Sequence, residues 1–147
     1  MLRNKDVKNY LNKFMEGTNL FEAATIPGYP TIDIRTATVA TKTADYTVTV
    51  ADLATPTIFD NAGDAGVQVL TLPAVALAKG KVIRAHVLAA QVIRLLPATG
   101  EAINYNGSAV VTKYLNVAGV IGNHVEVFCD GTQWVVTQGN GVVTKEA

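Results

Sequence analysis

Imidazole and thiol groups, which could act as bases, nucleophiles or metal ligands, are scarce in this chain. His86 and His124 are its only histidines, and Cys129 is its only cysteine. A hydrolase or transferase needs a nucleophile, a base and a group that orients the base. Both histidines lie inside predicted strands, and a surface or subunit-interface position is the favoured interpretation for each. A small enzyme would require a pocket that gathers His86 or His124 with Asp130 or Glu126.

The cysteine and the carboxylates also provide no clear catalytic or metal site. Cys129 has no predicted cation or helix N-terminus beside it to lower its pKa, so we expect it in the core. One cysteine excludes an intrachain disulfide and the usual zinc clusters. Residues 60–64 read Asp-Asn-Ala-Gly-Asp and could hold a hard cation such as calcium, but the remaining EF-hand positions are missing. An Asx turn is favoured there, and no catalytic residue, metal ligand or cofactor is predicted.

Three aromatic residues could stack on a sugar, namely Tyr105, Tyr114 and Trp134. Trp134 shares a strand face with Val136 just after a predicted turn, so packing beneath the neighbouring strand is favoured over exposure. Tyr46 is also expected in the core.

The composition points to assembly rather than to a free monomer. Hydrophobic residues make up 49% of the 147 residues and charged residues only 16%, which is low for a soluble monomer. We therefore expect a homo-oligomer. The net charge of zero provides no field for nucleic acid or an anionic membrane.

Membrane insertion and secretion are not expected either. No apolar stretch approaches the ~20 residues of a membrane helix. Lys5, Lys8 and Lys13 interrupt any signal-peptide core. Assembly in a cytoplasm is the expectation.

The elements that would position these side chains begin with a helix over residues 4–16. Asn4 can cap its start and Gly17 can end it. Its apolar residues recur at spacings of three and four and form one stripe: Val7, Tyr10, Leu11, Phe14 and Met15. So short a helix is marginal alone, and the stripe must therefore dock on its own domain, a sister subunit or a foreign partner.

A proline-containing arm follows the helix. Pro27 and Pro30 push their neighbours out of the helical region, which predicts an extended or turning segment. The arm residues that we expect to contact a partner are Ile26, Tyr29 and Ile32. A strand could resume within residues 31–39, and we place the boundary so that residues 1–42 are an attachment segment and residues 43–147 a β-rich module.

The β-rich module is predicted from alternating apolar runs separated by turn residues. The predicted strands span residues 46–50, 67–72, 81–89, 91–96, 110–117, 123–129 and 133–138. Residues 59–66 are predicted as a loop, and residues 72–78 could form one helical turn. The predicted fold is an all-β, antiparallel sandwich or barrel-like module of about 8–10 short strands.

Two dipeptides predict tight hairpins. Asp130-Gly131 and Asn106-Gly107 are both flanked by strand-like residues. Such pairs suit two-residue turns because both central residues need positive φ.

Three motifs carry a resemblance to a known family. They are Tyr-Thr-Val-Thr-Val at residues 46–50, Leu-Thr-Leu-Pro at 70–73 and Cys-Asp-Gly-Thr-Gln-Trp at 129–134. Together they resemble the small β-rich modules of bacteriophage virion proteins, which occur in capsid decoration proteins, head fibres and tail fibres. The resemblance covers residues 44–141 and leaves out the helix and the Pro-Gly-Tyr-Pro arm.

The resemblance implies a non-enzymatic virion protein that forms trimers. On this hypothesis the chain is a capsid decoration (cement) protein on the capsid surface, and its partner is the major capsid protein or another virion protein. The alternative is a tail fibre, spike or head-fibre component that attaches to host-surface glycans. Neither hypothesis involves a cofactor, nucleic acid or a membrane.

Overall fold

The computed structural model describes residues 38–141 and 143–146. The predicted helix and most of the predicted arm lie outside the described residues. The same holds for all their candidate partner-binding residues: Val7, Tyr10, Leu11, Phe14, Met15, Ile26, Tyr29 and Ile32. Their roles therefore stay predictions.

The described residues form twelve strands, one short helix and one 3-10 turn. The strands are β1 (Thr38–Thr41), β2 (Tyr46–Thr47), β3 (Thr57–Asp60), β4 (Gln68–Thr71), β5 (Val82–His86), β6 (Ile93–Leu96), β7 (Ala102–Tyr105), β8 (Ser108–Val111), β9 (Leu115–Val117), β10 (His124–Cys129), β11 (Trp134–Asn140) and β12 (Val143–Lys145). The 3-10 turn is η1 (Ala51–Leu53), and the helix is α2 (Val75–Ala78). The predicted helical turn within residues 72–78 is thereby confirmed.

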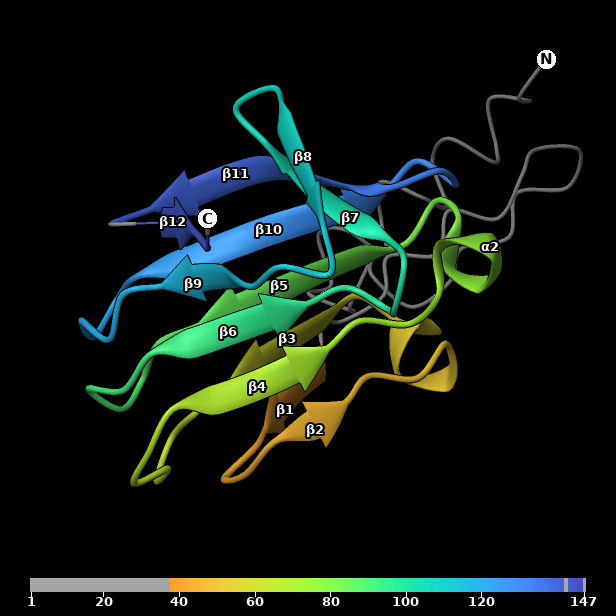
Figure 1. Ribbon diagram of the computed structural model, residues 1–147. Helices are drawn as coiled ribbons and strands as arrows, with labels where there is room; N and C mark the ends of the chain where they lie inside the picture. Colours follow the sequence, from red (N-terminus) through yellow and green to blue (C-terminus); the bar gives the residue numbers. More distant parts are fainter. Residues whose placement is uncertain (1–37, 142, 147) are drawn as a thin grey trace, which may run out of the picture. The chain divides into compact units, whose positions relative to one another are not determined.

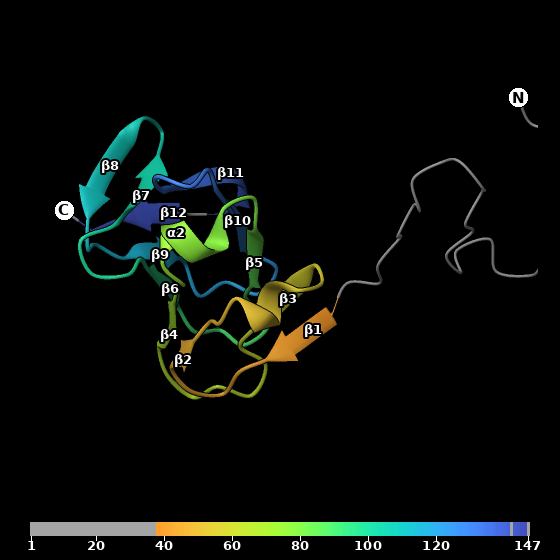
Figure 2. The same cartoon turned by 90° about the vertical axis from the view of Figure 1, so that its right-hand side faces the viewer.

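The strands form two sheets that face each other. One has seven strands in the order β1-β3-β5-β10-β11-β7-β8, and the other has five in the order β12-β9-β6-β4-β2. Figures 1 and 2 show β4 and β6 lying opposite β3 and β5. Apolar side chains of both sheets meet in one buried cluster, which includes Phe59, Leu70, Ile83, Ile93 and Trp134. The predicted all-β class is confirmed, and the arrangement is a sandwich.

The predicted antiparallel pairing holds for only part of each sheet, because both sheets also contain parallel neighbours. β1, β3 and β5 are parallel neighbours in the seven-stranded sheet, and β2, β4 and β6 are parallel neighbours in the other. From β1 to β6 the chain alternates between the two sheets. Each return to a sheet therefore adds a strand in the same direction as the last. Apolar alternation marks the strands but not their direction, so the sequence could not distinguish these crossings from hairpins.

The predicted strand over residues 46–50 is also wrong in its second half. β2 ends at Thr47, and η1 begins at Ala51. The Asp52 carboxylate explains the break, because it accepts hydrogen bonds from the Thr49 amide at 2.8 Å and the Tyr46 hydroxyl at 3.0 Å. A carboxylate that gathers nearby donors competes with the strand ladder and bends the chain.

Two further boundaries differ from the expected ones. Phe59, which the sequence pattern places in a loop, lies in β3 and is fully buried. The pattern misleads here because Asp60 and Asn61 are residue types that favour turns, yet both are buried. β1 precedes the expected boundary at residues 42 and 43, and it already pairs with β3.

The two predicted hairpin turns have different outcomes. Asn106 and Gly107 have φ of 53° and 79° and join paired residues Tyr105 and Ser108, which confirms a tight two-residue turn. The turn at Asp130-Gly131 is longer, because Cys129 pairs with Trp134 and leaves a four-residue loop. Gly131 is the one residue of this loop with positive φ, at 97°.

The side chain of Asp130 shapes this longer loop. Its Oδ1 accepts hydrogen bonds from the Thr132 amide and hydroxyl, both at 2.7 Å, and from the Gln133 amide at 2.9 Å. These donors lower the pKa of Asp130 to about 2.

Among the described residues, no helix is long and apolar enough to cross a bilayer.

Candidate functional site

Polar side chains gather on the face of the seven-stranded sheet that points away from the core. β5 and β10 are antiparallel neighbours, and their register sets Arg84 opposite Glu126 and His86 opposite His124. The residues between them in sequence, Ala85 and Val125, are fully buried. Strand alternation therefore places both polar pairs on the outer face, one above the other.

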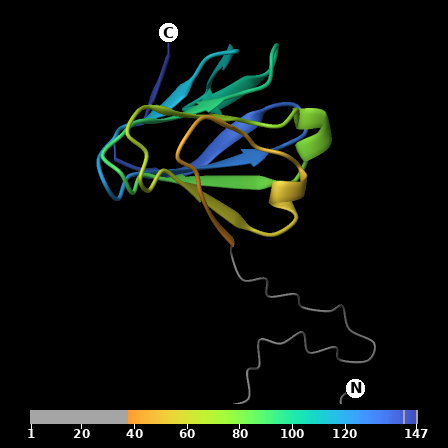
Figure 3. The same ribbon diagram turned by 90° about the horizontal axis from the view of Figure 1, so that it is seen from below.

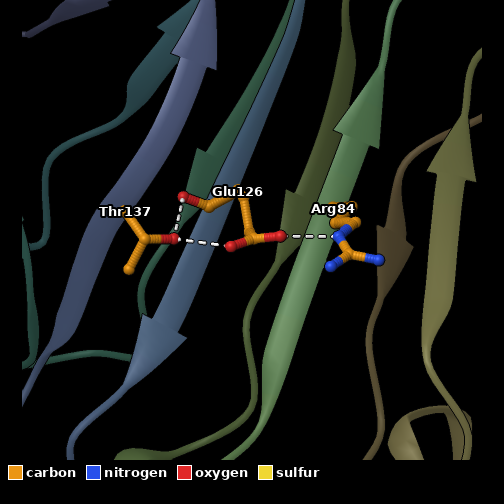
Figure 4. A network of polar contacts seen from close by, with 3 residues as sticks. All are labelled: Arg84, Glu126 and Thr137. Carbon is orange, nitrogen blue, oxygen red and sulfur yellow. Dashed lines mark hydrogen bonds and ion pairs between the residues drawn. The ribbon is translucent and has the colours of Figure 1, made fainter.

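The first pair is the centre of a small network (Figure 4). Arg84 Nε donates to Glu126 Oε2 at 2.6 Å, and the Thr137 hydroxyl donates to Glu126 Oε1 at 2.8 Å. The hydrogen bond from Arg84 is the main cause that lowers the pKa of Glu126 below its ordinary value. Glu126 is therefore an ionised acceptor at neutral pH and has a fixed orientation.

The second pair consists of two neighbouring imidazoles with tilted rings. The ring centroids of His86 and His124 are 5.2 Å apart, and their planes are tilted by 39°. Burial is the main cause that lowers the pKa of His86, and the neighbouring His124 and Arg84 act in the same direction. His86 is therefore neutral at pH 7.

A shallow cavity of about 280 Å³ connects the two pairs. Its lining residues are Ile58, Arg84, His86, His124, Val125, Glu126 and Gln138. The pocket that a small enzyme would require, one that gathers either histidine with Glu126 or Asp130, is therefore present, because both histidines and Glu126 line this cavity. Asp130 lies beyond the far end of β10 from His124. The lining residues include no hydroxyl or thiol group that could act as a nucleophile.

The structure places Cys129 and Trp134 in the core, as predicted. Both are fully buried. Burial is the main cause that raises the pKa of the Cys129 thiol, so the thiolate is disfavoured. Trp134 Nε1 donates to the Pro73 carbonyl oxygen at 3.3 Å, which satisfies the one polar atom of the indole.

The other two candidate sugar-stacking residues are half-buried. Tyr105 packs against the core cluster. Tyr114 lies beneath Arg94, whose guanidinium carbon is 5.2 Å from the ring centroid. With Trp134 buried, the three aromatic residues do not form an exposed platform.

An exposed apolar surface is a feature that the sequence does not predict. Leu88, Val120 and Ile121 expose 49%, 62% and 65% of their surface, and Val67 exposes 45%. They belong to the loops that follow β3, β5 and β9, and we call these four residues the apolar end. These loops are on the left in Figure 1, opposite α2. An isolated apolar loop residue carries no sequence signal, since only the fold brings these loops together.

Backbone hydrogen bonds hold two loops of the apolar end together. The Val87 amide donates to the Asn123 carbonyl at 2.8 Å, and the Gly122 amide donates to the Val87 carbonyl at 2.9 Å. The buried Asn61 side chain accepts from the amides of Leu88 and Ala89 at 2.8 and 2.9 Å. The apolar end is therefore a fixed surface.

The possible cation loop is an Asx turn, as predicted. Asp60 Oδ1 accepts from the Ala62 amide and Asp64 Oδ1 from the Gly66 amide, each at 3.0 Å. Within residues 38–141 and 143–146, no group of three or more His, Cys, Asp or Glu side chains is arranged to hold a metal ion.

Comparison with known proteins adds no relative to these observations. No protein-family model matches the chain, and no curated protein matches it. The likeness of its three motifs to phage virion modules therefore stays an expectation from the sequence.

Proposed function

We propose that this protein is a bacteriophage virion structural protein that decorates the capsid. In this proposal the β-sandwich associates with other copies of itself, as a trimer, and the residues that precede β1 attach it to the assembled shell. A protein that binds only the assembled shell raises the resistance of that shell to disassembly by mass action. The three sequence motifs support the virion assignment, and the following features of the sandwich support an assembly role.

The apolar end is the observation that carries the proposal. A chain with only 16% charged residues exposes four aliphatic side chains on neighbouring loops. Exposed aliphatic residues that are grouped on a fixed surface are typical of protein contact sites. We assign this surface to contacts between copies.

The direction of the strands shows that the apolar end and the first residue of β1 lie at opposite ends of the sandwich. β1 is parallel to β3 and β5, whose last residues lead into the loops of the apolar end. Thr38, the first residue of β1, therefore lies at the opposite end of the sandwich. Figure 3 shows η1 and α2, the gold and green coils, near each other on the right. One end of the sandwich can then contact other copies, while the residues that precede β1 connect to it at the other end.

The burial of Trp134 favours the shell over the glycan-binding fibre alternative. A sugar-binding site of the stacking type needs an exposed aromatic face. Trp134 is the largest of the three candidates and has no exposed surface.

The experiment that tests the proposal alters the predicted helix stripe in the full-length chain. We expect Leu11→Asn combined with Phe14→Asn to abolish binding to purified capsids, because both residues lie on the predicted docking stripe. Sedimentation of capsids with added protein measures the binding. The matched control is Asn9→Gln combined with Lys13→Gln on the opposite face, which should bind like the unaltered protein.

Light scattering measures the oligomeric mass of the same variants and so separates a loss of capsid binding from a loss of self-association. The stripe variant should keep the oligomeric mass of the unaltered protein. Undiminished capsid binding by this variant would contradict the attachment role of the helix, and a monomeric variant would place the helix in the contact between copies instead.

A further inference from the structure

His86 and His124 are opposed residues on two antiparallel strands, and they form the kind of pair whose side chains are closest together. The Val87 amide donates to the Asn123 carbonyl, and the Cys129 amide donates to the Lys81 carbonyl at 2.9 Å. Opposed residues alternate between hydrogen-bonded and non-hydrogen-bonded pairs, so the pair His86 and His124 is of the non-hydrogen-bonded type. Side chains at such pairs are nearer to each other, with Cα atoms about 4.5 Å apart.

We propose that His86 and His124 together bind a divalent transition-metal ion such as zinc or nickel. Metal–nitrogen bonds of about 2.0–2.1 Å at a tetrahedral angle place the centroids of two coordinated imidazoles about 5 Å apart. The observed separation of the centroids is 5.2 Å. The centroids of the two rings thus already lie at the separation that a chelating pair would have.

The surroundings of the two rings suit neutral imidazole ligands. His124 Nδ1 is 3.5 Å from the Gly122 carbonyl oxygen, which as an acceptor would direct the proton to Nδ1 and leave Nε2 for the metal.

Neighbouring charges do not block the site. Asp60 lies opposite His86 on β3, and its negative charge favours a cation there. The positive charge of Arg84 is paired with Glu126 through the 2.6 Å contact. The cavity of about 280 Å³ beside the rings has room for an ion and for waters of about 30 Å³ each. Two water molecules would complete a tetrahedral site, so the affinity should be lower than that of a closed four-ligand zinc site.

The test is a titration of the full-length protein with zinc chloride at pH 7.5, followed by calorimetry and by NMR of the imidazole signals. The chain has two histidines, so two sets of ring signals report on the site. We expect one zinc ion per chain, shifts of both sets of signals and no response to magnesium, which prefers oxygen ligands.

Variants localise the binding. His86→Gln and His124→Gln should each weaken zinc binding at least tenfold, whereas the exposed carboxylate variant Glu146→Gln should bind zinc like the unaltered protein. Imidazole signals of the unaltered protein that stay unshifted at saturating zinc would overturn the proposal. Equal zinc affinity of the double variant His86→Gln/His124→Gln would overturn it as well.

Discussion

Trp134 shows at the level of a single residue how the final hairpin is fixed to the sandwich. It follows the loop shaped by Asp130, is fully buried, and donates from its indole to the Pro73 carbonyl. It therefore joins β11 to the segment between β4 and α2. A side chain that fills the core and satisfies a buried carbonyl stabilises the fold in two ways.

Replacing Trp134 tests this role. Trp134→Phe keeps an aromatic ring but leaves the Pro73 carbonyl without its donor, so we expect a loss of about 1–3 kcal/mol in the free energy of unfolding. Urea unfolding followed by circular dichroism measures it. Val135→Ala, at the half-buried next position, is the comparison for loss of apolar volume alone. A Trp134→Phe midpoint equal to that of the unaltered protein would show that the indole hydrogen bond contributes nothing.

His86 predicts a specific pH dependence of stability. Its pKa is lowered in the folded state, so the unfolded chain binds more protons as the pH falls through the ordinary imidazole value near 6.5. Stability should therefore decrease from pH 7 towards pH 5. The groups that face His86 are His124 and Arg84, which oppose its protonation, and Asp60, which favours it.

His86→Gln should reduce this decrease because the uncharged amide binds no proton in this range. Thermal unfolding at pH 7 and at pH 5 for both proteins gives the comparison. His86 contributes nothing to acid sensitivity if the two proteins lose stability equally between these pH values.

Two loops at the apolar end pack so closely that one of them requires a glycine, Gly119. A Cβ atom at Gly119 would lie 2.7 Å from the Gln91 carbonyl carbon and 2.9 Å from the Val92 amide nitrogen. These are backbone atoms, so the loops before β6 and β10 would have to separate. We expect Gly119→Ala to cost about 1–3 kcal/mol of stability, as overpacking does.

Gly66→Ala is the matched control for this prediction. A Cβ atom at Gly66 would meet no atom within 4 Å beyond the chain neighbours, and this glycine does not have positive φ. Its replacement should be neutral or slightly stabilising, since alanine restricts the unfolded chain. Equal midpoints of urea unfolding for Gly119→Ala and the unaltered protein would contradict the close approach of the two loops.

The sequence predicted the strands better than their arrangement. Apolar alternation located β4, β5, β6, β10 and β11, and Asn106-Gly107 identified a tight turn. The direction of pairing depends on which sheet the strand after each loop joins. The composition of the loop does not encode that choice. The end of β2 depends on Asp52, whose hydrogen bonds are visible only in the folded chain.

The candidate site was predictable only residue by residue. His86 lies two residues after Arg84, and His124 lies two residues before Glu126, so in a strand the members of each pair share one face. Their meeting required the register of β5 against β10, which is a long-range property of the fold. The apolar end likewise required three loops to lie at the same end.

Self-association through the apolar end is the prediction for the whole molecule. Leu88→Asn, Val120→Asn and Ile121→Asn together should shift the full-length protein towards the monomer, because they remove exposed apolar surface. Light scattering after size-exclusion chromatography measures the mass. The control pair Val39→Asn and Leu77→Asn alters exposed aliphatic residues outside the apolar end. An unchanged mass of the triple variant would place the contact between copies elsewhere.

Occurrence in virus particles is the most direct test of the proposed function. Quantitative mass spectrometry of purified particles, against the major shell protein, gives the copy number of this chain. A decoration protein should be present in numbers comparable to those of the shell protein. A few copies per particle would contradict decoration and favour a fibre, and complete absence from particles would contradict a virion role altogether.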